Sequence, residues 1–214
     1  MEPEVLIVRE TYLSRLPRKG SVDAGALTAV ASVVTTLIYW NRASEVSRHL
    51  AGVRARVFAD HEYWRLLTGL LVHADLPHLV ANVLPLAFLS YLLYGYFGPI
   101  VYPLLCVALG VLVHGMALLT YPPDTELVGA SGLIYLMAAF WLTLYLCIER
   151  RFSLGKRLLR AVGFGLITLL PGTFDPVVSY RTHALGFMTG LCFGVVYFLV
   201  RKDVIRQAEV VEVD

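Results

Sequence analysis

Two short motifs at the ends of apolar runs place a serine and a histidine where they could act together. Gly129-Ala130-Ser131-Gly132 opens an uncharged run that ends at Glu149. His183 opens a second uncharged run, Ala184 to Val200. A serine becomes a nucleophile when a neighbouring base accepts its proton, and an imidazole can be that base. If both runs are helices that enter a membrane from the same side, the pair predicts serine chemistry inside the bilayer.

The surroundings of Ser131 fit that chemistry. At a helix N-terminus, Ser131 would have free backbone N–H groups beside it, which favour a developing oxyanion. Tyr135 lies four residues later on the same helix face, where its ring could stack on the imidazole. His78 and Asn82 are also four residues apart, and both can donate hydrogen bonds to an oxyanion. Each feature has a plainer interpretation: a small-residue helix contact, a core aromatic, and a polar contact between helices.

A glycine stripe could bring the two motifs together. Gly186, Gly190 and Gly194 follow His183 on one helix face and would let another backbone approach closely. Gly129 and Gly132 are the expected partners. By itself, His183 would more often be an interior histidine held by hydrogen bonds.

Composition indicates an all-α membrane protein. The chain of 214 residues is 57% hydrophobic and 16% charged, with a mean hydropathy of +0.68. No charged residue occurs from Leu76 to Pro123, a stretch long enough for two membrane spans. A net charge of +2 is too small to suggest a nucleic-acid partner, so the expected environment is the lipid bilayer.

The apolar pattern predicts a bundle of six transmembrane helices in one domain. The fifth is the weakest, because it is short and ends at Pro171-Gly172, and the first is expected to be a retained anchor. The expected spans are residues 23–40, 78–95, 99–120, 128–148, 158–174 and 183–201. We expect residues 1–22 and 202–214 to be short polar cytoplasmic tails around a domain of residues 23–201.

Loop charges predict that both termini are cytoplasmic. Lys and Arg gather before span one, between spans four and five, and after span six, whereas residues 121–127 carry only acidic charges. Residues 41–77 are an exception to this pattern, because the loop contains five arginines but lies outside in such a topology. Spans two, four and six then begin at the outer face. His78, Asn82, Ser131 and His183 would therefore lie at one depth, just inside the outer surface.

A metal site is a weaker alternative. His73, His78 and His183 could gather zinc, but the sequence has no H-E-x-x-H motif. Cys106, Cys147 and Cys192 each lie within apolar runs and are expected to be small buried hydrophobes. We therefore expect no metal and no cofactor.

The motifs together resemble those of the rhomboid intramembrane serine proteases. The resemblance extends from the first loop through the sixth helix. It rests on Glu62-Tyr63-Trp64-Arg65, on His73 and His78 followed by Asn82 in an H-x4-H-x3-N pattern, on Gly129-Ala130-Ser131-Gly132 with Tyr135, and on His183-Ala184-Leu185-Gly186.

The resemblance implies a role for each matched residue. Ser131 would attack the scissile carbonyl, with His183 as general base and then acid. His78, Asn82 and the Ser131 N–H would hold the oxyanion. The implied supporting residues are Tyr135 stacked on His183, Gly129 beside the oxyanion hole, His73 near the mouth of the site, and Trp64 and Arg65 anchoring the first loop.

The implied substrates are membrane proteins with a helix-destabilised transmembrane segment, cut near the outer face of the cell membrane. They would arrive laterally, past span five and the loop that contains Pro171, Gly172 and Pro176. Two other functions stay open: an inactive rhomboid-like protein that binds membrane clients, and a small proton-coupled transporter.

Two features depart from the family pattern. The turn at Gly95–Pro99 lacks the acidic residue that ties this loop down in many members. His114 in span three matches no family position, and we expect it to make an interior hydrogen bond.

Overall fold

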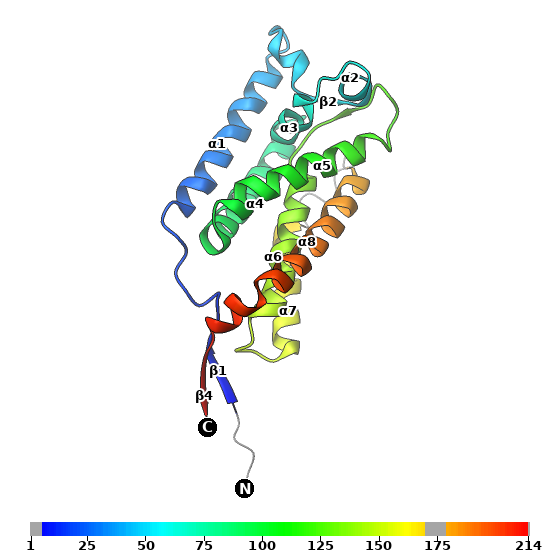
Figure 1. Cartoon of the computed structure of the whole chain (residues 1–214). Helices are drawn as coiled ribbons and strands as arrows, with labels where there is room; N and C mark the ends of the chain where they lie inside the picture. Colours follow the sequence, from blue (N-terminus) through cyan, green and yellow to red (C-terminus); the bar gives the residue numbers. More distant parts are fainter. Residues whose placement is uncertain (1–5, 170–178, 214) are drawn as a thin grey trace.

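The structure is a computed structural model that describes residues 6–169 and 179–213. It is an elongated helical bundle with both chain ends at one end and the first loop at the other (Figure 1). Two short two-stranded sheets complete the described part. The elements are β1 Leu6–Glu10, α1 Ser21–Trp40, the 3₁₀ helix η1 Val46–His49, β2 Gly52–Val53, α2 Arg54–Phe58, α3 Trp64–Leu71, α4 Leu76–Phe97, the π-helix η2 Ile100–Leu105, α5 Cys106–Leu118, β3 Glu126–Leu127, α6 Ser131–Ile148, α7 Leu154–Leu169, α8 Tyr180–Gln207 and β4 Val210–Val213.

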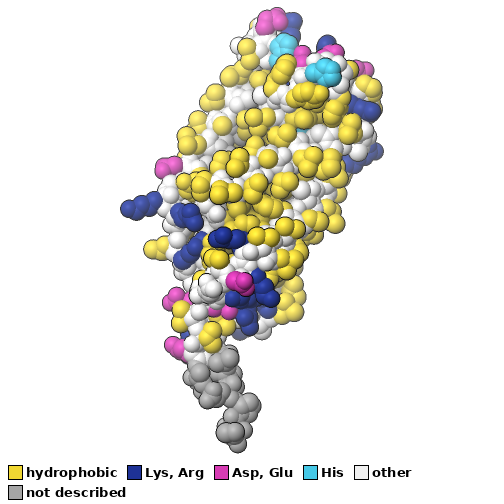
Figure 2. Space-filling view, in the orientation of Figure 1, with side chains coloured by type: hydrophobic (Ala, Val, Ile, Leu, Met, Phe, Trp, Pro, Cys, Tyr) yellow, Lys and Arg dark blue, Asp and Glu magenta, His cyan; other side chains and the backbone are white. Residues whose placement is uncertain are grey.

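The structure confirms the helical membrane bundle. Within the described residues, five helical segments are long and apolar enough to cross a membrane: α1, α4, η2 with α5, α6 and α8. The predicted fifth span, residues 158–174, corresponds to α7, whose described part ends at Leu169. Residues 170–174 lie outside the described residues, so a sixth crossing remains a prediction. Figure 2 shows hydrophobic side chains over the middle of one face and charged side chains at its two ends.

Helix α6 is the centre of the bundle. Leu136, Met137, Phe140 and Leu144 on this helix are completely buried. The Phe140 ring stacks on Phe193 of α8 at a centroid distance of 4.4 Å and meets the Phe97 ring of α4 edge-on. Because large side chains fill the space on several sides of α6, its position in the bundle is tightly defined.

The two ends of the chain pair with each other. β1 and β4 form an antiparallel ribbon, and Arg9 Nε donates to Glu212 Oε2 at 2.8 Å. The sequence predicted only polar tails here, and no pattern in it indicated the pairing. The ribbon lies at the end of the bundle opposite the first loop (Figure 1).

The first loop, residues 41–77, is a folded unit that uses its own arginines. Arg54 donates to the Tyr121 carbonyl at 2.9 Å, and Arg56 pairs with Asp60 at 2.8 Å. β2 pairs with β3, which attaches the loop to the segment before α6. These contacts explain why the loop carries so many positive charges: part of that charge stabilises the loop itself.

The turn after α4 is held without the acidic residue found in many rhomboid proteases. The Arg18 N–H donates to the Gly95 carbonyl at 2.9 Å, and the Arg15 guanidinium donates to the Tyr96 carbonyl. Gly98 has a φ of +84° and lies against the Arg18 side chain. The segment that precedes α1 therefore replaces the missing tie.

Candidate active site

Ser131 is the first residue of α6, and the loop before it is fixed at several points. Gly129 has a φ of +112°, a conformation that favours glycine, and its N–H donates to the Gly69 carbonyl at 2.9 Å. The helix was expected to start at residue 128. It starts three residues later because β3 and Gly129 hold the preceding backbone in non-helical conformations. The partly exposed Ser131 thus lies at a helix N-terminus, whose dipole favours negative charge.

Two glycines of α8 let its backbone approach the backbone of α6 closely. A Cβ placed on Gly186 would lie 2.2 Å from the Gly132 carbonyl oxygen, and one on Gly190 would lie 2.1 Å from that of Leu136. Gly194 lies against the side chain of Thr143. The expected glycine stripe is therefore present, with Gly132 as a partner. The expectation for Gly129 was wrong, because Gly129 turns away and lies against His78.

The close contact brings His183 over the face of α6 that carries Tyr135. The two rings stack with centroids 4.0 Å apart and 13° between their planes. His183 is 4% exposed, and its Nε2 has no hydrogen-bond partner among the described residues. In particular, no hydrogen bond joins it to Ser131 Oγ. The imidazole is thus held by stacking, and its Nε2 remains able to accept a proton.

His78 and Asn82 come from the first turns of α4. Asp75 caps this helix, since its carboxylate accepts from the His78 N–H at 2.8 Å. Asn82 is buried, and its Nδ2 donates to the His78 carbonyl at 2.8 Å. The His78 ring lies beside Gly129, where a Cβ would come within 2.7 Å of it. His78 and the Ser131 motif are therefore neighbours, although they come from distant parts of the sequence.

His73 is completely buried next to His78. Its Nδ1 lies 3.1 Å from Thr36 Oγ1, and its carbonyl accepts from Trp40 Nε1 at 2.8 Å. Its ring meets the edge of His78 with a centroid distance of 5.1 Å. Burial and, to a smaller extent, the positive charge that His78 can carry lower the pKa of His73 to about 3. A neutral His73 therefore connects α1 to the ring of His78.

Trp64 and Arg65 lie in the first loop and not in the site. Arg65 is buried, and its Nη1 donates to the carbonyls of Arg48 and Ala51 at 2.9 and 3.0 Å. Its guanidinium also pairs with Glu62. Trp64 is about half exposed and donates to the His49 carbonyl at 3.3 Å. Arg65 thus holds several loop segments together, while the Trp64 ring remains available to the membrane interface.

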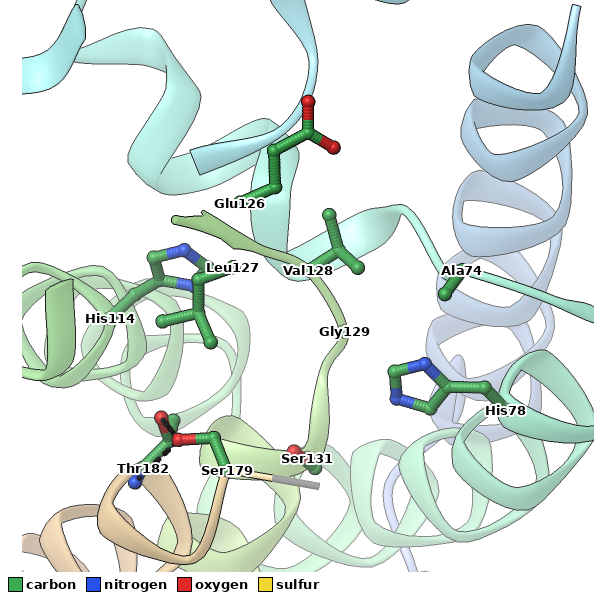
Figure 3. A pocket seen from close by; sticks show the side chains of 10 residues that line it. All are labelled: Ala74, His78, His114, Glu126, Leu127, Val128, Gly129, Ser131, Ser179 and Thr182. Atoms are coloured by element: carbon green, nitrogen blue, oxygen red, sulfur yellow. Dashed lines mark hydrogen bonds between the residues drawn. The ribbon is translucent and has the colours of Figure 1, made fainter. Parts of the chain in front are cut away.

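A small cavity of about 60 Å³ opens beside Ser131 (Figure 3). His78 lies on one side of it and His114 on the other. Its lining residues are Ala74, His78, His114, Glu126, Leu127, Val128, Gly129, Ser131, Ser179 and Thr182. No sequence motif marks His114, Ser179 or Thr182 as site residues, and only the fold brings them there.

The alternative zinc set is not supported by the geometry. Among residues 6–169 and 179–213, no three His, Cys, Asp or Glu side chains form a group that could hold a metal ion. His73, His78 and His183 therefore do not make such a site. The cysteines at 106, 147 and 192 are free thiols. Cys106 is buried as expected, but Cys147 is partly exposed and Cys192 is exposed, so the expectation of burial was wrong for these two.

Comparison with known proteins identifies the family. Residues 60–200 match the rhomboid domain. The chain is 29% identical over 139 residues to "Putative rhomboid protease YdcA" of Bacillus subtilis (strain 168), covering 64% of this chain and 66% of that protein. It is 30% identical over 150 residues to "RHOMBOID-like protein 2" of Arabidopsis thaliana, covering 69% of this chain but only 46% of that protein. The chain belongs to the rhomboid family, whose members are generally serine intramembrane proteases.

Proposed function

We propose that this protein is a serine endopeptidase that cleaves transmembrane segments near the outer face of the membrane with a Ser131–His183 dyad. The observation that carries the proposal is the stacking of Tyr135 on His183 at 4.0 Å, one helical turn from Ser131. Because α6 and α8 touch through Gly132 and Gly186, the two helices have little room to shift against each other. A dyad has no third catalytic residue to orient its histidine, and the Tyr135 ring would orient His183 instead.

In the proposed reaction, Ser131 Oγ attacks the scissile carbonyl carbon while His183 Nε2 accepts the hydroxyl proton. The oxyanion is stabilised by the Ser131 N–H and by the side chains of His78 and Asn82. The intermediate then collapses, His183 donates its proton to the departing amine, and an acyl-enzyme remains on Ser131. Catalytic hydrogen bonds are often long before substrate binds, which accommodates the unpaired Nε2 of His183.

Substrate is proposed to arrive between α4 and α7. An apolar groove of about 710 Å³ separates these helices and is lined by Pro77, Val80, Ala81, Leu84, Pro85, Phe88, Phe164, Ile167 and Thr168. A membrane segment can lie in such a groove without exposing polar groups to lipid.

A segment that is to be cleaved must unwind, because an intact helix keeps its carbonyls in internal hydrogen bonds. We therefore propose substrates with Gly, Ala or other weak helix formers near the outer end. The residues after α7 assigned to the gate, including Pro171, Gly172 and Pro176, lie outside the described residues.

The proposed location is the cell membrane, with both termini in the cytoplasm and residues 23–201 forming the protease domain. Two observations support this orientation. The terminal ribbon lies near Arg150, Arg206 and Glu209, so basic residues from several segments gather at this end. At the other end, the arginines of the first loop have local partners, which weakens the one charge argument against this topology.

The test is cleavage of a reconstituted single-span substrate that carries an Ala-Gly-Ala sequence near its outer end. Ser131→Ala and His183→Ala should each abolish cleavage, and the double variant should lose no more than either single one, because the pair acts as a unit. Ser90→Ala is the control, since Ser90 is buried in α4 but lies outside the proposed dyad and oxyanion hole. Substantial cleavage by Ser131→Ala would overturn the proposal. A folded wild type that binds the substrate without cutting it would favour the inactive rhomboid-like protein.

A further inference from the structure

Glu126 brings a negative charge to the cavity beside Ser131, and the proposed dyad and oxyanion hole do not use it. Among the described residues that line this cavity, Glu126 is the only Asp, Glu, Lys or Arg. It belongs to β3, and the backbone from Glu126 to Gly129 forms one wall of the cavity (Figure 3). Its exposed carboxylate is turned away from Ser131. The charge therefore lies at the edge of the cavity rather than at the reacting atoms.

A buried tyrosine holds the Glu126 carboxylate in place. Tyr39 on α1 is 3% exposed, and its hydroxyl donates to Glu126 Oε2 at 3.0 Å. The Arg42 guanidinium covers the Tyr39 ring, with its central carbon 4.2 Å from the ring centroid. Because Tyr39 is fixed by its own packing, the carboxylate is oriented before any ligand arrives. Such preorganisation lowers the entropy cost of a further polar contact.

The oriented carboxylate has no cationic partner in the described part of the chain. No ion pair joins Glu126 to a lysine, arginine or histidine there. Arg54 and Arg181, which reach the same loop from two sides, donate instead to the backbone carbonyls of residues 121 and 120. A fixed charge of one sign at a cleft attracts a ligand group of the other sign. The group that would complete this site is therefore a cation that the ligand supplies.

The wall between Glu126 and Ser131 determines where such a cation would lie along a substrate. The five residues of backbone between the two positions span at most about 17 Å when extended. The turn at Gly129, where φ is +112°, shortens this path. An unwound substrate segment that reaches Ser131 along this wall would pass Glu126 within about five residues of the cut.

We propose that Glu126 is a specificity-determining residue that selects substrates with a lysine or arginine about two to five residues from the cut, on its outer side. The inference rests on the proposed function, because it describes the substrate of that same site. The cation would pair with Oε1 while Tyr39 holds Oε2. Glu126 does not touch the reacting atoms, so its charge acts on binding and placement of the substrate, and kcat/KM reports it.

The experiment compares substrates that differ only in one charge. In the single-span Ala-Gly-Ala substrate, Lys, Ala or Glu is placed in turn at each of the four positions two to five residues outside the cut. Neutral detergent micelles remove the effect of membrane surface charge. At the position nearest Glu126 we expect kcat/KM for Lys to exceed that for Glu by roughly tenfold, with Ala between them. Lys and Glu have similar helix propensities, so unwinding should not distinguish them.

Charge reversal separates recognition from folding. Glu126→Lys should prefer the Glu substrate over the Lys substrate, and a damaged fold cannot produce this inversion. Asp124→Lys is the matched control, because Asp124 lies in the same loop but does not line the cavity. This control should keep the wild-type order. Tyr39→Phe keeps the ring but loses the hydrogen bond to Oε2, so it should reduce the preference to about threefold.

Three results would count against the proposal. Equal kcat/KM for Lys and Glu substrates at all four positions in the wild type would overturn it. So would a Glu126→Lys protein that keeps the wild-type order, because Glu126 would then have only a structural role. If the wild type neither cleaves the Ala substrate nor reacts with a fluorophosphonate, the proposed function itself fails, and this inference falls with it.

Discussion

The α6/α8 contact and the α4/α7 contact are built on opposite principles. Between α6 and α8, glycines bring backbone against backbone, with the Gly186 Cα beside the Gly132 carbonyl. Between α4 and α7, large apolar side chains leave a groove of about 710 Å³, and Phe88 and Phe164 meet with ring centroids 6.1 Å apart. The first contact carries Ser131 and His183, whereas the second carries no residue of the proposed dyad.

The two contacts correspond to two different requirements of proteolysis within a membrane. A nucleophile and a base must be held within a fraction of an ångström of their working geometry. A substrate helix, by contrast, needs a side of the enzyme that can open. A close backbone contact meets the first requirement, and loosely filled apolar surfaces meet the second. The predictions that follow test this division, beginning with the largest expected effect.

Closing the loose contact should stop cleavage completely. In a variant whose three native cysteines are replaced by alanine, Phe88→Cys combined with Phe164→Cys should allow α4 and α7 to be joined by a bifunctional thiol reagent with a reducible linker. Cleavage of the single-span substrate in vesicles should then cease and should return after the linker is reduced. Each single-cysteine variant is the control for the reagent itself. Cleavage at full rate by the cross-linked protein would mean that substrate arrives elsewhere.

The oxyanion donors lie where the two regions meet, on α4 but facing the α6 motif. Asn82→Ala should lower kcat by roughly 10²–10³-fold, with a much smaller change in KM, because the amide would act on the transition state. Steady-state kinetics with the same substrate would measure this. Full activity in this variant would reduce Asn82 to a helix-packing residue and leave His78 and the backbone N–H as the donors.

Loosening the close contact should cost about 10²-fold in activity. A Cβ at Gly186 would lie 2.2 Å from the Gly132 carbonyl oxygen, so Gly186→Ala must push α8 away from α6. A displacement of about 1 Å can lower a rate by that factor. Gly163→Ala on α7 is the matched control, since a Cβ there meets no atom within 4 Å. Equal activity in the two variants would show that the glycine contact does not position the dyad.

The smallest expected effect is a pH dependence of the unfolding free energy that comes from His73, the neighbour of His78. The pKa of His73 is about 3 in the folded protein, against 6.5 for an ordinary histidine. Between these values the unfolded state binds more protons, so His73 makes the folded state lose stability as the pH falls from about 6.5 toward 3. The slope from one such group is at most about 1.4 kcal/mol per pH unit. His73→Asn should flatten the curve of unfolding free energy against pH in mild detergent. An unchanged curve would contradict the lowered pKa of His73 as a source of the pH dependence.

The sequence was most informative about the close contact. Helical periodicity placed Gly186, Gly190 and Gly194 on the His183 face, and spacing placed Tyr135 one turn after Ser131. The stacked rings and the Gly186–Gly132 contact follow from those periodicities. Most spans were also predicted to within a few residues, because long apolar runs define them.

Features that depend on irregular backbone were not predictable in this way. The positive φ of Gly129 turns it toward His78, and no periodicity specifies such a turn. The Arg54 contact with Tyr121 and the Arg15 contact with Tyr96 join segments that are distant in sequence. In the sequence, His114 is one polar residue in an apolar helix, and only the fold places it at the cavity beside Ser131.

The central claim, that Ser131 is a nucleophile activated by His183, is tested most directly by fluorophosphonate labelling of the protein in membranes. We expect the wild type to gain one label, which peptide mapping assigns to Ser131. Ser131→Ala should gain none, and His183→Ala should react far more slowly although it is folded. A label on another residue, or equal labelling rates in the wild type and His183→Ala, would contradict the claim.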